Sequence, residues 1–387
     1  MWNILFLGLV SFFADISAEM VYPIIPLYLT STFGATPALV GLIEGIAESL
    51  ASLLKVFSGY ISDRSQKKKR LAFIGYMTGL IYKIALILAT SWVGILVARV
   101  IDRIGKGIRT SPRDVMVSES APANQLGQAF GLHKALDMAG SAIGILLAYF
   151  IIQGNLNTST YKTLFLVSMI PALIGLGLFA FIREQKNHPI KTREPFWKRV
   201  GELDNNLKLY LLVAFIFTLG NSSNTFLLLR AKSVGFTDSS VILLYFLYNL
   251  SASLLAFPFG KRSDKVGRRR ILILGYLVFA FVYLGFGFAY NQIMIVSCFL
   301  LYGLYTAMIT GVERAYIAEI SPSDLKGTML GLHSTLVGIA LLPASLIAGV
   351  LWDLFGAVVP FIFGSSLALL AAILLVFFMP NESLSSY

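Results

Sequence analysis

The densest group of chemically capable side chains is ARVIDRIGKGIRTSPRD at residues 98–114, where seven of seventeen residues are charged. Such a stretch could hold a phosphate, bind nucleic acid or line an aqueous cavity. A phosphate loop needs G-x-x-x-x-G-K-[ST] between a strand and a helix, and this stretch lacks that spacing. A nucleic-acid patch lies on a soluble basic face, whereas this stretch continues the apolar run SWVGILVA. Because ionisable residues within a membrane span face water or a charged partner, the stretch indicates the wall of an aqueous cavity.

Other ionisable residues occur at a similar depth in neighbouring apolar segments. A rise of about 1.5 Å per residue puts most of them near the middle of the bilayer, where transporters bind substrates and ions. Two pairs of acids are spaced i,i+4, so each pair occupies one helix face. The residues expected to couple protons are Asp15, Glu19, Glu44, Glu48, Asp102, His133 and Asp137. The residues expected to contact substrate are Arg99, Arg103, Lys106, Asn221 and Asn224.

The same charges could serve packing alone. Arg99, Arg103 and Lys134 could neutralise the acids as buried ion pairs, because buried charges are usually paired. The corresponding part of the second half has Asn221 and Asn224 and almost no charge, and a purely structural network would be expected in both halves. We therefore hypothesise that the first half carries the coupling chemistry and the second supplies neutral substrate contacts. Three more basic residues are interpreted as structural or snorkelling, since long basic side chains reach interfaces easily: Lys55, Lys83 and Arg230.

The composition defines the elements that must carry these residues. Hydrophobic residues make up 57% of the chain and charged residues only 13%, about half of the roughly 25% found in soluble proteins. Several nearly uncharged stretches reach the roughly 20 residues that a transmembrane helix needs. The sequence therefore predicts an all-α polytopic membrane protein. The single Cys298 allows no disulfide within the chain, and the absence of metal-ligand spacings or a nucleophile triad argues against an enzyme, a metal or a cofactor.

The net charge of +11 is concentrated in three loops, at residues 63–70, 183–208 and 261–270. These loops fall on one side of the membrane when spans are counted from the N-terminus, and Lys and Arg concentrate on the cytoplasmic side. We therefore expect a plasma (inner) membrane protein with both termini in the cytoplasm. Its basic loops would lie near anionic lipid rather than nucleic acid. The first apolar segment lacks a basic n-region and a cleavage site, and is interpreted as a retained span.

The second half of the sequence repeats the first, as ASLL at 51–54 and again at 252–255 illustrates. Each copy is predicted to contain six spans, which gives twelve transmembrane helices in two pseudo-symmetric halves. The predicted parts are a first half at 1–182, a cytoplasmic linker at 183–207 and a second half at 208–387. The predicted spans are 3–31, 37–61, 71–89, 91–117, 125–152, 161–182, 208–230, 236–259, 271–289, 292–318, 326–352 and 357–379. Two such halves repeated in parallel describe an alternating-access transporter.

Two loops carry a resemblance to a known family. GKRSDKVGRR at 260–269 fits G-x-x-x-D-[RK]-x-G-[RK]-[RK], the loop pattern of the major facilitator superfamily, and GYISDRSQKK at 59–68 departs from it at Gln66. The opening stretch also resembles the fourth-span pattern of that family through Arg99 and Pro112. The chain thus resembles a major facilitator secondary transporter of the drug or metabolite exporter-like group. This resemblance implies the twelve-helix fold, a central cavity lined by helices 1, 4, 7 and 10, and a monomer.

The resemblance also implies a gate at the cytoplasmic helix ends. Loop acids and bases pair with neighbouring helices in one state and separate in the other, which biases a two-state equilibrium. The matching positions are Asp63, Arg64, Asp264, Lys265, Glu119 and Glu319. The repeat further aligns Arg113-Asp114 with Glu313-Arg314, the same positions with opposite signs. We predict contacts of Arg113 with Glu313 and of Asp114 with Arg314 when the cytoplasmic side is closed.

These patterns favour a secondary transporter that couples protons to the efflux of an amphiphilic or anionic small molecule. The basic surplus of the fourth span favours anionic groups, and the resemblance to exporters favours export. Import by proton symport would use the same residues and stays the alternative, followed by a transport-inactive membrane sensor. The expected partners are a small-molecule substrate, protons and membrane lipid.

Overall fold

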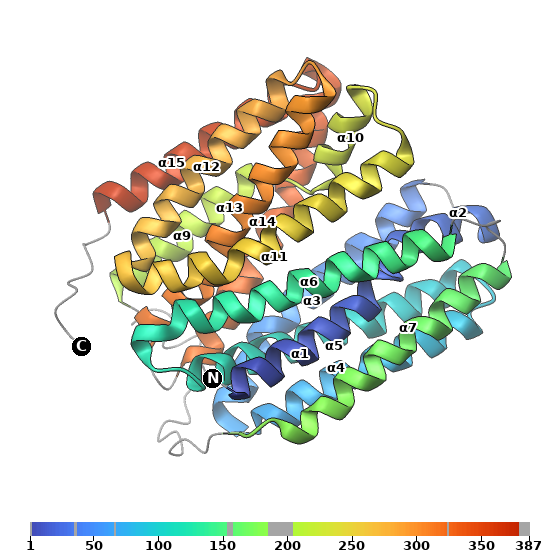
Figure 1. Ribbon diagram of the computed structural model, residues 1–387, viewed down its shortest axis with the longest axis horizontal. Helices are drawn as coiled ribbons and strands as arrows, with labels where there is room; N and C mark the ends of the chain where they lie inside the picture. The colour runs from blue at the N-terminus through green and yellow to red at the C-terminus, as the bar shows by residue number, and fades with distance from the viewer. Residues whose placement is uncertain are drawn as a thin grey trace. The chain divides into compact units, whose positions relative to one another are not determined.

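The computed structural model describes residues 2–34, 37–65, 67–152, 158–184, 204–322 and 325–378, and the regular elements among them are all helices (Figure 1). Contacts between Cα atoms divide the chain into two compact units. Unit 1 comprises Met1–Ser120, Leu136–Ile190 and Asp324–Thr335, and unit 2 comprises Ala121–Ala135, Lys191–Ser323 and Leu336–Tyr387. Each unit therefore includes a short segment from the opposite sequence repeat.

Nine helices within the described ranges are long and apolar enough to cross a membrane. They are α1 (Trp2–Glu19), α4 (Lys68–Leu88), α6 (Leu126–Ile152), α7 (Thr158–Leu178), α11 (Asp238–Val266), α12 (Arg268–Phe288), α13 (Gln292–Ile320), α14 (Lys326–Phe355) and α15 (Val359–Phe378). Two further helices are comparably long, α3 (Pro37–Ser65) and α5 (Trp92–Glu119). The low mean hydropathy of α5 follows from the charged stretch 98–114 that it contains.

The first helix of each repeat is interrupted, whereas the sequence predicted continuous spans there. In the first repeat, α1 is followed by the 3₁₀ turn η1 (Tyr22–Ile24) and by α2 (Ile25–Phe33). A proline in this turn lacks the N–H that a continuous helix needs. In the second repeat, Asn-Ser-Ser-Asn separates α9 (Asn205–Gly220) from α10 (Thr225–Ser233), and such short polar side chains compete for backbone hydrogen bonds. The two interruptions lie at equivalent positions of the repeat.

Helix packing in unit 1 fixes the charged face of α5. Helix α4 packs on α5 and α7, α1 packs on α7, and α3 packs on α5 (Figure 1, blue to green). Glycines bring α4 and α5 together, since a Cβ atom at Gly105 would lie 2.7 Å from the carbonyl oxygen of Gly75. An aromatic cluster adds buried apolar area, with the Tyr28 ring 4.9 Å from Tyr161 and 5.4 Å from Phe165.

Unit 2 has an aromatic core. Helix α13 packs on α11 and α12, and α15 packs on α9 and α12 (Figure 1, yellow to red). The ring of Phe217 stacks on Tyr276 at a centroid distance of 4.1 Å, and the ring of Phe279 lies 3.9 Å from Tyr283. Two tyrosines of α13, Tyr302 and Tyr305, also pack against the ring of Phe279.

One close contact between helix backbones, which we call a glycine crossing, occurs at the same repeat position in each unit. In unit 1, a Cβ atom at Gly59 of α3 would lie 2.2 Å from the carbonyl oxygen of Gly327 of α14. In unit 2, a Cβ atom at Gly260 of α11 would lie 2.2 Å from the carbonyl oxygen of Gly127 of α6. The four glycines occupy equivalent repeat positions, so the sequence repeat is also a repeat of helix contacts.

Candidate functional site

The charged face of α5 is buried inside unit 1. Arg99 and Arg103 are only 1% and 4% exposed. Asp102 lies between them, with its Oδ2 atom 3.4 Å from Arg99 Nη1 and 3.8 Å from Arg103 Nε. The Tyr22 ring lies 5.4 Å from the Arg99 guanidinium and 5.8 Å from that of Arg103, and Tyr22 is 43% exposed. The cluster therefore combines two buried cations, one anion and a tyrosine that reaches the surface.

The carboxyl group of Glu19, at the end of α1, belongs to the same cluster. Four charged residues on α5 and α6 act on it electrostatically: Lys106, Arg103, Arg99 and Asp137. The Oε2 atom of Glu19 is buried without a hydrogen-bond partner. Among the predicted coupling and substrate residues, the structure thus brings together three acids and three bases: Glu19, Asp102, Asp137, Arg99, Arg103 and Lys106.

Two glycines of α6 allow α1 to approach this closely. A Cβ atom at Gly140 would lie 2.2 Å from the carbonyl oxygen of Phe12, and one at Gly144 would lie 2.6 Å from that of Ile16. A side chain at either position would push α1, and Glu19 with it, away from α6.

Other predicted coupling residues lie elsewhere or outside the described part of the chain. Asp15 is partly buried on α1, and His133 is 1% exposed and belongs to unit 2 rather than unit 1. The side chains of four predicted residues lie outside the described residues: Glu44, Glu48, Asp63 and Arg64. Within the described residues, no three His, Cys, Asp or Glu side chains come together as a metal site would require.

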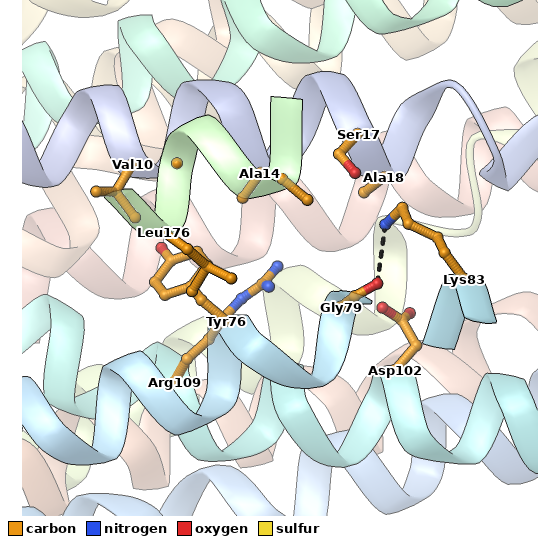
Figure 2. Close-up of a pocket in the computed structure, with 12 residues that line it drawn as sticks. Val10, Ala14, Ser17, Ala18, Tyr76, Gly79, Lys83, Asp102, Arg109 and Leu176 are labelled. Atoms are coloured by element: carbon orange, nitrogen blue, oxygen red, sulfur yellow. Dashed lines mark hydrogen bonds between the residues drawn. The ribbon is translucent and has the colours of Figure 1, made fainter. Parts of the chain in front are cut away.

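A small polar pocket lies beside the cluster in unit 1 (Figure 2). It is lined by residues of α1, α4, α5 and α7. Its three charged residues are Lys83 of α4 and Asp102 and Arg109 of α5. The Asp102 carboxylate therefore lies between the paired guanidinium groups and this pocket.

In unit 2 the two predicted asparagines bind tyrosines. Asn221 donates from Nδ2 to the hydroxyl oxygen of Tyr305 at 3.0 Å, and Tyr302 donates its hydroxyl to Oδ1 of Asn224 at 2.9 Å. Tyr283 and Tyr302 also direct their hydroxyl groups to Oδ1 of Asn221, each at 3.4 Å. The sequence analysis missed these tyrosines because aromatic residues are common in transmembrane helices and no spacing marks them.

The second basic loop forms a network at the end of α11. The backbone N–H groups of Gly127 and Gln128, the second and third residues of α6, donate to the Asp264 carboxylate at 2.8 and 2.7 Å. Arg268 pairs with Asp264 at 2.8 Å and with Glu319 at 2.6 Å. Lys265, which the sequence assigns to the gate, is exposed and is not part of this network in the described residues. The left-handed Gly267, with φ of 93°, turns the chain back so that Arg268 reaches Asp264.

The first basic loop repeats part of this network in unit 1. Lys68 forms an ion pair with Glu119, the repeat equivalents of Arg268 and Glu319. The neighbouring basic residues also correspond, since Lys69 donates to the carbonyl of Ile182 at 2.6 Å, and Arg269 donates to two carbonyls near the end of α15 at 2.8 Å. The basic loops therefore bind helix ends in addition to marking the predicted cytoplasmic side.

The residues of the second predicted gate have partners within their own units. Arg113 donates from Nη2 and Nε to Asp114 at 2.9 and 3.1 Å, and from Nη1 to Ser11 at 3.3 Å. The Tyr276 hydroxyl lies 3.4 Å from Glu313 Oε1. The contacts predicted between Arg113 and Glu313 and between Asp114 and Arg314 stay a prediction.

Comparison with known proteins gives one family throughout. The sequence model of the Major Facilitator Superfamily matches residues 7–230 and 209–386. An uncharacterized MFS-type transporter of Methanocaldococcus jannaschii is 38% identical over 381 residues, which cover 97% of this chain and 94% of the relative. A multi-drug resistance efflux pump PmrA homolog of Lactococcus lactis is 24% identical over 330 residues, covering 81% and 79%. The solved structure of the MFS proton:xylose symporter XylE has a TM-score of 0.81 at 18% identity, covering 98% of this chain and 95% of that one.

Proposed function

Because the chain belongs to the Major Facilitator Superfamily, we propose that it is a proton-coupled transporter that exports an amphiphilic or anionic compound. Family membership makes it a multi-pass integral membrane transporter rather than an enzyme. Beyond family membership, we propose the coupling ion, the direction of transport and the class of substrate. It also includes a plasma-membrane location with both termini in the cytoplasm, a monomeric state, and two functional halves at 1–182 and 208–387 joined by the linker 183–207.

The observation that carries this proposal is the buried cluster of α5 with Glu19. Arg99 and Arg103 place two buried guanidinium groups beside Asp102, and guanidinium groups offer paired hydrogen bonds to an anionic group. The Glu19 oxygen that lacks a hydrogen bond costs free energy while it is ionised and buried. The protonation of this carboxyl group is coupled to the charge of the neighbouring guanidinium groups, which a bound substrate anion would offset.

The unit 2 network supports an amphiphilic substrate. Its amide and phenol groups, on the interrupted helix α9–α10 and on α13, offer uncharged hydrogen bonds beside aromatic rings. Discontinuous helices are the usual location of binding sites in secondary transporters. We therefore assign neutral substrate contacts to Asn221 and Asn224, together with Tyr302 and Tyr305.

Gating is assigned to the loop networks. Asp264 and Arg268 with Glu319, and Lys68 with Glu119, hold helix ends that must separate if the cytoplasmic side opens. The name of the Lactococcus lactis relative supports export. Import by proton symport would use the same residues and differs only in the sign of flux under an imposed pH gradient, whereas a transport-inactive sensor would show no flux.

The test uses the full-length protein in proteoliposomes with an imposed pH gradient. Two amphiphilic dyes serve as probes, the anion anilinonaphthalene sulfonate and the cation ethidium. We expect pH-driven movement of the anion against protons, and a loss of about tenfold or more in Arg103→Gln, which corresponds to about 1.4 kcal/mol. Arg70→Gln alters an exposed arginine of α4 and should transport normally. Flux that is independent of the pH gradient in the wild type, or unchanged in both Arg103→Gln and Glu19→Gln, would refute the proposal.

A further inference from the structure

The pocket of unit 1 is large enough for water. Its walls leave about 20 Å³ for the centre of a water molecule, and about 10–15 Å³ suffices for one. Gly79 of α4 forms part of the wall, and no atom lies within 4 Å of the position that its Cβ atom would occupy. The open space therefore extends over the Gly79 backbone, next to the charged residues of the pocket.

Lys83 extends into this pocket instead of snorkelling to a surface. The residue is only 2% exposed, and its Nζ atom donates to the carbonyl oxygen of Gly79 at 3.2 Å. Figure 2 shows the Lys83 ammonium and the Asp102 carboxylate on the same side of the pocket, beside Gly79. Within the described side chains, Lys83 forms no ion pair with a carboxylate. An ammonium has three donors, so this buried group has two donors left for pocket water.

Lys83 has one anionic and one cationic neighbour on α5. Asp102 and Arg109 on α5 act on it electrostatically. Arg109 lies with its guanidinium 4.4 Å from the ring of Tyr76, and the Lys83 Nζ atom lies 5.3 Å from the Tyr82 ring. Helices α1 and α7 contribute only uncharged residues to the pocket lining.

Asp102 has little capacity to balance Lys83, because it already pairs with Arg99 and Arg103. Arginines do not lose their protons in proteins, whereas a buried lysine changes its protonation state readily. Among the charged residues of the pocket lining, Lys83 is therefore the cation that can lose a proton without breaking the Asp102 ion pairs.

We propose that Lys83 is a proton-exchange site of unit 1, an inference that rests on the proposed proton-coupled transport. The Lys83 ammonium gives one proton to the pocket water, which leaves a neutral amine and a hydronium ion. The proton then passes to the aqueous side, and the reverse step restores the ammonium. Asp102 stays ionised throughout and holds the water in place.

The first test reads Lys83 directly and needs no substrate. Full-length protein in proteoliposomes is treated with trace acetic anhydride, which acetylates only neutral amines, over about pH 6 to 9. Peptide mass spectrometry compares Lys83 with Lys162, an exposed lysine of α7. The labelling rate of Lys162 should rise about tenfold per pH unit, as expected for an ordinary lysine. The labelling rate of Lys83 should stop rising within this pH range. A Lys83 rate that parallels Lys162, or no labelling of Lys83 at any pH, would overturn the proposal.

A matched glycine pair tests the role of the pocket. Gly79 and Gly177 both have open space around the Cβ position, but only Gly79 faces the pocket. Gly79→Ala should slow Lys83 labelling several-fold because its methyl group displaces the water, and Gly177→Ala should leave it unchanged. Equal effects of the two variants would contradict water-mediated exchange. If labelling of Lys83 falls when chloride replaces gluconate in the buffer at constant pH, the pocket binds an anion and the proposed proton exchange is wrong.

The second test separates a proton carrier from a structural cation. Lys83→Arg keeps the positive charge but cannot release a proton, whereas Lys83→Met removes the charge. In both Lys83 variants, we expect the pH gradient to drive no accumulation of anilinonaphthalene sulfonate, although the dye still exchanges across the membrane. The control Lys162→Met should retain both accumulation and exchange. Full pH-driven accumulation in Lys83→Arg would refute the inference and leave the proposed function standing. A wild-type protein that accumulates no dye would refute the proposed function, whereas the labelling profile would still report on Lys83.

Discussion

The contact of Asp264 with the N-terminus of α6 permits a quantitative prediction. Its carboxylate accepts the N–H groups of Gly127 and Gln128 at 2.8 and 2.7 Å. Hydrogen bonds to charged groups contribute about 1.5–3 kcal/mol each. Since about 1.4 kcal/mol corresponds to a factor of ten, Asp264→Ala should accelerate amide exchange at these two residues by roughly 10- to 150-fold. Asp264→Asn keeps one acceptor oxygen and should give an intermediate value.

Hydrogen–deuterium exchange measured by mass spectrometry on a peptide over residues 126–131 provides the assay. Lys265→Ala, at the exposed neighbouring position, is the matched control and should leave exchange of this peptide unchanged. If Asp264→Ala exchanges no faster than the wild type, or if Lys265→Ala accelerates exchange equally, the carboxylate does not hold the helix end and the gating assignment of Asp264 fails.

Two further predictions concern packing and the unit 2 network. Gly59→Ala would place a Cβ atom 2.2 Å from the Gly327 carbonyl oxygen, and such overpacking costs about 1–3 kcal/mol. Its thermal unfolding in detergent should therefore occur at a lower temperature than that of Gly177→Ala, whose Cβ atom meets nothing within 4 Å. Tyr305→Phe removes the acceptor of the Asn221 amide, and an unsatisfied buried group costs about 1–3 kcal/mol. Dye accumulation should fall while expression persists, and an unchanged transport rate would exclude this pair from substrate contact.

Much of the fold could be predicted because membrane helices leave a strong signal in composition. Apolar runs predicted twelve spans, and the described helices correspond to them, with the first and seventh each divided in two. Hydropathy averages over a window and does not register the interruption at Tyr22–Ile24 or the one after Gly220. A proline in the first case and four short polar residues in the second were visible in the sequence, but their effect depends on packing around them.

The sequence predicts that certain charged residues lie close together, but it does not predict which of them pair. Charge and depth indicated that Arg99, Asp102 and Glu19 share a region, because few places in a membrane protein tolerate them. Which base pairs with which acid depends on local backbone geometry. Arg268 rather than Lys265 reaches Asp264 because Gly267 reverses the chain. The sequence indicates a structural or snorkelling role for Lys83, and only the packing of four helices shows that its side chain ends in a pocket.

The two glycine crossings have a mechanical consequence. Where Gly59 of α3 faces Gly327 of α14, and where Gly260 of α11 faces Gly127 of α6, the two backbones touch with no side chain between them. Neither crossing has room for a larger residue, because a methyl group at Gly59 or Gly260 would force the two helices apart. Because the sequence carries this crossing twice, a larger residue at one crossing would separate one pair of helices and leave the equivalent pair in contact.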